Sequence, residues 1–244
     1  MTRVLPYGDR ALLVEVDSLA AVLALYPALD AARVRGIGEL VPSARTVLVT
    51  VDPARLSLGA AERWIRGVDA ALPGPSSGAV SGSATSSTSG PLVTIPVRYT
   101  GEDLAEVAAL THTSVGDVIR RHTGTDWRVA FIGFSPGFAY LADAAADAPL
   151  DTRSIPRRTT SRPRVPAGAV GLAGEFTGIY PRESPGGWQL IGHTDVVLWD
   201  VNRPSPALLA PGTRVRFVDL DSVQGADALP GAAVLPDAAA GVTE

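Results

Sequence analysis

The sequence predicts an α+β protein with two domains: a small N-terminal split-βαβ, ferredoxin-like unit and a larger C-terminal β-barrel or sandwich. Three observations support this prediction. The chain has 244 residues, enough for one large or two small domains. Residues 73–91 contain fourteen Gly, Ser or Pro residues among nineteen and no charge, which is typical of a flexible linker. Strand and helix patterns alternate before this segment, and short apolar runs between Gly and Pro follow it.

The N-terminal part, residues 1–72, has an order of elements that fits a split-βαβ unit. Apolar or β-branched runs predict strands, and apolar residues at helical spacing predict helices. Ser18 is a candidate N-cap for the first helix, and Pro27 is expected to kink or end it. We expect, in order, a strand at Ala11–Val16, a helix at Leu19–Leu25, a strand at Thr46–Val51, a helix at Leu58–Leu72 and, after the linker, a last strand at Leu92–Val97.

The second domain, residues 92–221, opens with two helix signals, Glu102–Leu110 and a segment from Thr113 or Ser114 to His122. Short strands separated by turn residues are typical of a barrel or sandwich. They are expected at Trp127–Ile132, Val170–Ala173, Trp188–Ile191, Val196–Trp199 and Val215–Val218. Residues 222–244 contain no basic or aromatic residue and are expected to form a frayed tail.

Two residue types are absent. Without cysteine the chain forms no disulfide, thiolate zinc site or cysteine nucleophile. Without lysine it offers no Schiff base, no phosphate-loop lysine, no biotinylated lysine and no Ser–Lys pair, because all 21 basic residues are arginine. Any reaction that needs one of these groups must take it from another protein.

The charge and hydropathy patterns exclude further classes of protein. The net charge is −4, so nucleic acid is not an expected partner. The longest apolar stretch, Leu19–Leu29, has 11 residues and contains a proline, so no membrane span is expected. The first ten residues lack the apolar core of a signal peptide, and we therefore expect a cytoplasmic protein.

The three histidines show no spacing of a helical metal site, and we expect no metal. His112 and His122 are expected at the surface or at helix ends. His193 ends a strand-like run among turn residues and is a candidate for a functional role.

Arginines and aromatic residues gather in the C-terminal half. Arg157, Arg158, Arg162 and Arg164 lie within eight positions, among three prolines, where a stiff backbone favours an anion or partner site over a plain solvated loop. Residues 133–138 do not form a nucleophile motif, because proline follows the serine; we expect a rigid, partly apolar loop or a plain turn with its aromatic residues in the core. Glycine-rich turns around Tyr180 and Trp188 are typical of pocket rims and also of ordinary barrel corners.

Three segments together resemble a known family: Phe131–Leu141 (Phe-Ile-Gly-Phe-Ser-Pro-Gly-Phe-Ala-Tyr-Leu), Val165–Gly174 and Gly178–Gly192. They are similar to the KipI/PxpB family, also called allophanate hydrolase subunit 1. Gly8–Leu12 and Leu208–Phe217 fit the family as well, so the resemblance covers roughly residues 5–218.

The resemblance implies a cyclophilin-like C-terminal barrel and a subunit that is inactive alone. With a KipA/PxpC-type and a LamB/YcsF (PxpA)-type subunit, the family forms a 5-oxoprolinase, which opens 5-oxo-L-proline to L-glutamate with ATP used by the complex. No cofactor is expected on this chain. Two alternatives stay open: a carboxyltransferase-type subunit of the urea or allophanate pathway, and a KipI-like inhibitor of a histidine kinase.

For the site, the resemblance implies a barrel cleft that holds a small carboxylate substrate or a phosphorylated intermediate. The negative charge of the ligand is expected to bind those arginines of this chain that stand where the family has arginines. Tyr180 and His193 are expected to donate hydrogen bonds or transfer protons as catalytic residues. The chain departs from the family where Phe176 replaces a glutamine and His193 an arginine. The expected substrate-binding residues are Arg157, Arg162, Arg164, Phe134, Phe138 and Trp188.

Overall fold

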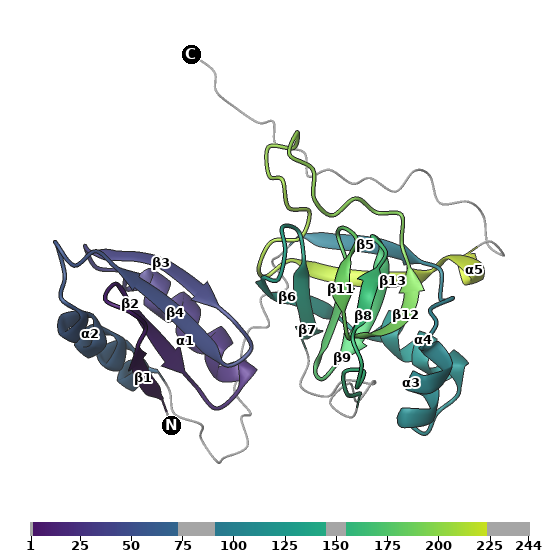
Figure 1. Ribbon diagram of the computed structural model, residues 1–244, viewed down its shortest axis with the longest axis horizontal. Coiled ribbons are helices and arrows are strands. Elements are labelled where there is room, and N and C mark those ends of the chain that lie inside the picture. Colours follow the sequence, from purple (N-terminus) through teal and green to yellow (C-terminus); the bar gives the residue numbers. More distant parts are fainter. Residues whose placement is uncertain (1, 73–90, 145–154, 224–244) are drawn as a thin grey trace. The chain divides into compact units, whose positions relative to one another are not determined.

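The computed structural model describes residues 2–72, 91–144 and 155–223 (Figure 1). The chain divides into two compact units, Met1–Ser86 and Ser87–Glu244, which we describe separately. The expected linker and tail lie almost entirely outside the described residues, so both remain predictions.

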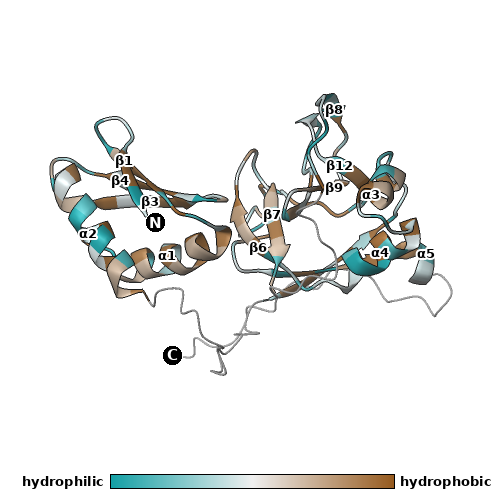
Figure 2. Ribbon diagram, turned by 90° about the horizontal axis from the view of Figure 1, so that it is seen from below, coloured by the Kyte–Doolittle hydropathy of each residue, from teal (hydrophilic) through white to brown (hydrophobic). Residues whose placement is uncertain are grey.

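The first unit is a four-stranded antiparallel sheet with two helices on one face (Figure 2). The strands lie in the order β1-β2-β4-β3. Alternate residues of these strands point toward the helices and form an aliphatic core that includes Val14, Val47 and Val49. The elements are β1 Arg3–Pro6, β2 Ala11–Glu15, α1 Leu19–Ala31, β3 Ile37–Pro42, β4 Thr46–Val51 and α2 Leu58–Ala71.

The two helices start where serines cap them. The Ser18 hydroxyl accepts a hydrogen bond from the Ala21 N–H, and Ser57 caps α2 in the same way. Pro27 does not end α1, which continues to Ala31. Leu25 and Leu29, both buried, hold the helix against the sheet on either side of the proline, so packing outweighs the lost backbone hydrogen bond.

The ferredoxin-like topology is confirmed, but its fourth strand is not the expected Leu92–Val97. The N-terminal strand β1 takes that edge position and pairs with β2. A tight turn makes this possible: the Tyr7 N–H bonds the Ala11 carbonyl at 2.9 Å, and Gly8 adopts φ +67°. Leu92–Val97 instead forms β5 of the second unit, parallel to β13.

The second unit is a seven-stranded sheet in the order β12-β9-β10-β7-β6-β13-β5, with a separate two-stranded ribbon of β11 and β8. The sheet nearly closes into a barrel, because Arg98, just after β5, and His193, at the end of β12, exchange backbone hydrogen bonds of 2.8 and 2.9 Å. Its elements are β5 Leu92–Val97, α3 Leu104–Leu110, α4 Val115–Gly124, β6 Trp127–Ile132, β7 Ala139–Asp143, β8 Arg162–Val165, β9 Ala169–Ala173, β10 Phe176–Ile179, β11 Ser184–Gly186, β12 Gln189–His193, β13 Arg214–Asp219 and α5 Leu220–Val223.

The barrel interior holds mostly aliphatic side chains, and one histidine lies among them. His122 is in the last turn of α4, as expected for a helix end, but it is fully buried rather than at the surface. Its ring packs 4.4 Å from the Phe217 ring. The expected surface position is therefore wrong for His122, while His112 is exposed.

The expected strand at Val196–Trp199 is also absent: this described segment has no regular structure beyond an isolated bridge between Trp199 and Ala207. Leu198 is buried in the core whereas Val197 is exposed, so the run contributes to the core without joining the sheet. Among the described residues, no helix is long and apolar enough to cross a membrane.

Candidate functional site

Seven aromatic rings form one cluster on the outer face of the barrel. On β9 and β10, the side chains of Val170, Leu172 and Ile179 point into the core. Because side chains alternate along a strand, the neighbouring positions 171 and 178 face outward. Neighbouring rings have centroids 4.4 to 6.3 Å apart. The cluster consists of Phe131, Phe134, Phe138, Tyr140, Phe176, Tyr180 and Trp188.

Two glycines let Trp188 lie against the strands. A Cβ on Gly171 would be 3.1 Å from the Trp188 Cβ, and one on Gly178 would be 3.1 Å from its Cζ3 atom. Trp188, Phe138 and Tyr180 are consequently buried, and the rings fill the space between them. The accessible edge of the cluster is formed by Tyr140, which is partly buried, and by Phe134, which is 59% exposed.

The four neighbouring arginines lie on residues 157–164, which we call the arginine segment. This segment runs beside the aromatic cluster. The Arg158 N–H donates to the Gly187 carbonyl at 2.8 Å, and the Gln189 side chain donates to the Pro156 carbonyl at 3.4 Å. Arg157 lies between Pro156 and Arg158, and Trp188 lies between Gly187 and Gln189. Because the flanking residues are bonded across the two segments, Arg157 lies opposite Trp188. Within the described part of the chain, the exposed Arg157 side chain has no hydrogen bond or ion pair.

The phenols of Tyr140 and Tyr180 lie within electrostatic reach of Arg157. Burial raises the pKa of Tyr140, and the positive charge of Arg157 opposes that rise. Burial also raises the pKa of Tyr180, against a hydrogen bond from the Trp188 backbone and the charge of Arg157. Both phenols therefore keep their protons at neutral pH, and each can donate a hydrogen bond.

Two other arginines of the segment are already paired with a buried carboxylate. Asp103, 3% exposed, accepts from Arg158 at 2.6 Å and from Arg162 at 2.7 Å. Arg162 also contacts Glu102 at 3.2 Å. Its hydrogen bond to Asp103 is the main reason why the pKa of Arg162 is raised.

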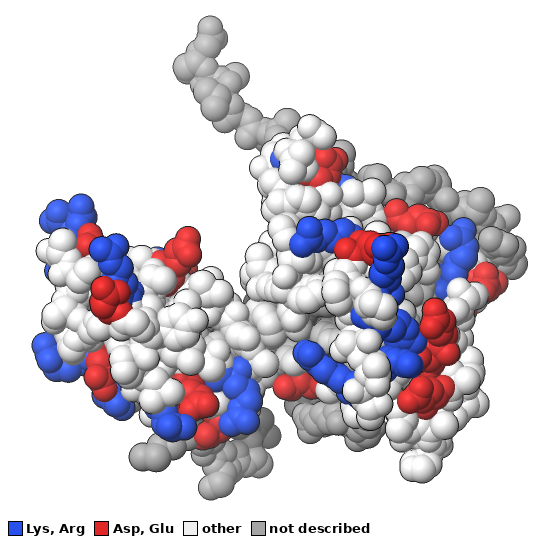
Figure 3. Space-filling model, in the orientation of Figure 1, with Lys and Arg blue, Asp and Glu red and all other residues white. Residues whose placement is uncertain are grey.

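The remaining expected site residues lie apart from these groups. Arg164 is exposed, 3.7 Å from Glu183. His193 Nε2 is 3.3 Å from the Asp195 carboxylate, which also accepts from Arg98 at 2.9 Å. In the described ranges, the His193 ring does not join the aromatic cluster. Figure 3 shows arginine side chains, with acidic ones among them, on the face of the second unit where β8 and β11 lie.

The structure thus brings together five of the expected site residues, and among those that it adds are Tyr140 and Asp103. The five are Phe134, Phe138, Tyr180, Trp188 and Arg157. Tyr140 was missed because β7 was not predicted, although two-residue alternation after Phe138 places it on the same face. Asp103 stands at the N-cap of α3, where the sequence alone indicates a helix cap.

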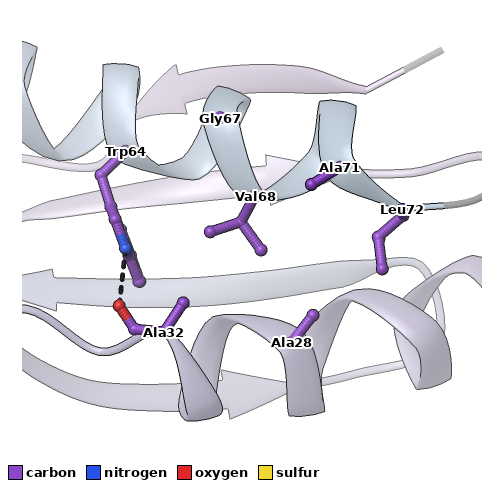
Figure 4. Close-up of a pocket in the computed structure, with 7 residues that line it drawn as sticks. All are labelled: Ala28, Ala32, Trp64, Gly67, Val68, Ala71 and Leu72. Carbon is purple, nitrogen blue, oxygen red and sulfur yellow. Dashed lines mark hydrogen bonds between the residues drawn. The ribbon is translucent and has the colours of Figure 1, made fainter.

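A separate groove lies in the first unit, between α1 and α2 (Figure 4). It has a volume of about 550 Å³ and is lined by apolar side chains. The one polar side-chain group of its lining, the Trp64 indole N–H, already donates to the Ala32 carbonyl at 2.9 Å. The groove therefore presents no free group for chemistry. Among the described residues, no cluster of three or more His, Asp or Glu side chains could hold a metal ion.

Comparison with known proteins gives relatives for this fold. The chain is 46% identical over 129 residues to the B subunit of the 5-oxoprolinase of Escherichia coli O157:H7, covering 52% of this chain and 57% of the relative. It is 43% identical over 130 residues to the protein of the same name from Bacillus subtilis strain 168, covering 52% of each. The chain therefore spans about half the length of the curated relatives it matches.

Two solved structures superpose on this chain. TTHA0988 superposes with a TM-score of 0.64 at 37% identity, over 86% of this chain and 39% of that one. The Kluyveromyces lactis urea carboxylase, with a TM-score of 0.66 at 19% identity over 91% of this chain and 22% of that one, shares the fold. The model of the carboxyltransferase domain, subdomain C and D, matches residues 2–209. The chain therefore belongs to the family of carboxyltransferase domains, subdomain C and D, and the resemblance to KipI/PxpB proteins is confirmed.

Proposed function

We propose that this chain is the B subunit of an ATP-dependent 5-oxoprolinase and that its aromatic cluster, with Arg157, contacts the small carboxylate substrate. The similarity to three 5-oxoprolinase B subunits supports the activity. The observation that carries the site is the convergence of two protonated phenols and a guanidinium, unpaired within the described residues, beside an apolar wall.

These groups match the chemistry of 5-oxoproline. The Arg157 guanidinium binds the ring carboxylate, because a fork of N–H donors fits a carboxylate. The phenol O–H of Tyr140, at the accessible edge of the cluster, donates to the lactam oxygen, where negative charge grows when the carbonyl carbon is attacked, and the buried Tyr180 phenol lies behind it. The ring methylenes lie against Phe134. Ring opening breaks the amide C–N bond: water supplies the new carboxylate oxygen, the ring nitrogen takes up a proton to become the amino group of glutamate, and ATP is hydrolysed to ADP and phosphate.

The chain supplies only part of the machinery in this proposal. It has no lysine to hold ATP phosphates, so ATP binds elsewhere in the complex. A KipA/PxpC-type and a LamB/YcsF (PxpA)-type subunit complete the enzyme, which we place in the cytoplasm. His193, bonded to Asp195 in this chain, remains a candidate for proton transfer in the assembled complex.

The test is turnover of 5-oxoproline, followed as glutamate and ADP formed. It is measured for the purified chain alone, for each pair of subunits and for all three together. We expect activity only from the full set. Turnover by this chain alone would overturn the subunit proposal, and no turnover by an assembled, folded complex would overturn the activity.

A second candidate function rests on one relative. The chain is 31% identical over 123 residues to the urea amidolyase of Lachancea kluyveri, covering 47% of this chain and 6% of that protein, and together with the carboxyltransferase family model this favours carboxyl transfer to an amide. This chain has no lysine for biotin, so a separate biotin-carrying protein would have to deliver the carboxyl group. Transfer from a carboxylated biotin protein to urea, with no turnover of 5-oxoproline, would favour this candidate over the first.

A further inference from the structure

Asp103 occupies the N-cap position of α3, yet its carboxylate does not cap the helix. Aspartate is a favoured N-cap residue, and a cap stabilises a helix. The carboxylate instead accepts three hydrogen bonds from other segments: from Arg158, from Arg162 and, at 2.7 Å, from the Leu190 N–H of β12. This buried carboxylate therefore bonds segments other than the helix that it begins.

These bonds join three segments. The Asp103 N–H also donates to the Leu190 carbonyl at 3.0 Å, so the start of α3 and β12 are bonded in both directions. The Arg158 guanidinium connects Asp103 to the arginine segment directly after Arg157. The Arg158 backbone is held in turn by Gly187. Arg157 therefore stands between a residue fixed to Asp103 and a residue fixed to Gln189.

We propose that Asp103 is a positioning residue: its carboxylate, through Arg158 and Leu190, fixes Arg157 opposite Trp188, so that Arg157 alone of the segment's four arginines meets the substrate carboxylate. This inference rests on the proposed function for its ligand. Its structural part, the dependence of Arg157 on Asp103, is independent of the activity. Arg158 and Arg162 then hold the segment in place, and Arg164 faces solvent.

The kinetic test uses the three-subunit complex with 5-oxoproline as the varied substrate. Arg157→Ala is expected to raise KM roughly ten- to a hundred-fold, the loss for one charge-assisted hydrogen bond. Asp103→Asn keeps the side-chain volume but removes the charge, and it is expected to raise KM more than kcat falls. If Asp103 acts through Arg157, the double variant will have the KM of Arg157→Ala alone.

Two further variants keep this test decisive. Glu102→Gln is the matched control: it removes an exposed carboxylate from Arg162 without touching Arg158, and we expect an unchanged KM. Arg158→Met breaks the same connection with Asp103 still paired to Arg162, and it replaces Asp103→Asn if that variant does not fold. A wild-type KM in folded Asp103→Asn, or effects that multiply in the double variant, would overturn the proposal.

A second measurement does not depend on activity. Backbone amide order parameters of Arg157 and Arg158 are measured by NMR in the purified chain, for wild type, Asp103→Asn and Glu102→Gln. We expect Asp103→Asn to lower them at both residues and Glu102→Gln to leave them unchanged. If the complex does not turn over 5-oxoproline, the proposed function fails, while unchanged order in Asp103→Asn would overturn the positioning role.

Discussion

The Tyr99 hydroxyl lies 2.7 Å from Nδ1 of His122 inside the barrel. His122 Nε2 is 3.0 Å from the Thr177 hydroxyl, which itself donates to the Gly171 carbonyl at 3.1 Å. Thr177 must therefore accept from His122, so the ring carries its proton on Nε2 and accepts from Tyr99 on Nδ1. Both ring nitrogens of this neutral histidine are satisfied, and a second proton, on Nδ1, would displace the hydrogen bond that Tyr99 donates.

This arrangement makes the stability of the second unit depend on pH. Burial lowers the pKa of His122 from 6.5 to about 3. The unfolded chain therefore binds a proton between these values that the folded protein does not, and stability is lost as pH falls below about 6.5. At pH 5 we expect a loss of about 2 kcal/mol, from 1.36 kcal/mol per pKa unit over about 1.5 units.

The measurement is denaturant unfolding between pH 7.5 and 5, followed by tryptophan fluorescence, since three of the four tryptophans lie in the second unit. His112→Asn is the control, because His112 is exposed and asparagine tolerates its positive φ of 52°. It should keep the full pH dependence. A free energy of unfolding that stays flat over this range would contradict the assignment.

Much of the fold follows from local pattern. Strands such as Thr46–Val51, Trp127–Ile132 and Val215–Val218 are rich in β-branched and aromatic residues, and the structure has a strand at each. Two of the strands that were not predicted, β8 and β11, read Arg-Pro-Arg-Val and Ser-Pro-Gly. Each of them is a strand only through its hydrogen bonds to the other, and no local propensity indicates this pairing.

The site was predictable in kind but not in detail. The aromatic turns and the arginine run mark the region from the sequence alone. Which arginines are engaged in ion pairs depends on Asp103, which is 59 residues from Arg162 along the chain. The burial of His122 depends likewise on Thr177, 55 residues away. Such pairs form by tertiary packing, so periodicity and spacing carry no trace of them.

Gly168 is expected to be essential for closing the barrel. Its N–H donates to the Tyr180 carbonyl at 2.7 Å, and its carbonyl accepts from Thr194 at 2.9 Å. In Gly168→Ala, the new Cβ would overlap the Thr194 carbonyl oxygen and lie 2.6 Å from His193 Cε1, at a φ of +81°. We expect a loss of about 3 kcal/mol or more in the free energy of unfolding.

Gly174→Ala separates the two causes of that loss. Gly174 has a φ of +57° and no atom within 4 Å of the new Cβ, so only backbone strain of about 1–2 kcal/mol applies. Denaturant unfolding of both variants gives the comparison. Equal losses would show that the close approach at Gly168 is relieved by small movements of its neighbours.

Phe134 holds a strained backbone at the accessible edge of the aromatic cluster. Its φ of +66° is rare for a bulky residue. Phe134→Gly and Phe134→Ala remove the same ring contacts with Phe138 and Tyr180, but only glycine relieves the strain. We therefore expect Phe134→Gly to be the more stable by about 1 kcal/mol.

The same pair of changes at Ile132 is the control. This residue lies at the end of β6, is 45% exposed and has no positive φ. There alanine should be favoured over glycine by about 0.5–1 kcal/mol. Thermal or denaturant unfolding of the four variants decides the comparison, and the same order at both positions would show that Phe134 carries no strain in solution.

The roles of Arg162 and Arg164 differ although they are two residues apart. The Arg162 side chain is 14% exposed and holds Asp103, whereas Arg164 is 80% exposed and 3.7 Å from a half-exposed glutamate. Arg162→Met leaves the buried Asp103 carboxylate with one guanidinium instead of two, so we expect a loss of about 1.5–3 kcal/mol in the free energy of unfolding. Arg164→Met should stay within about 0.5 kcal/mol of wild type, because exposed ion pairs contribute little.

Denaturant unfolding at two salt concentrations measures both variants, and the Arg162 effect should persist at high salt because the pair is shielded from solvent. Equal stabilities of the two variants would contradict a structural role for Arg162 and return it to the set of arginines that can meet the substrate.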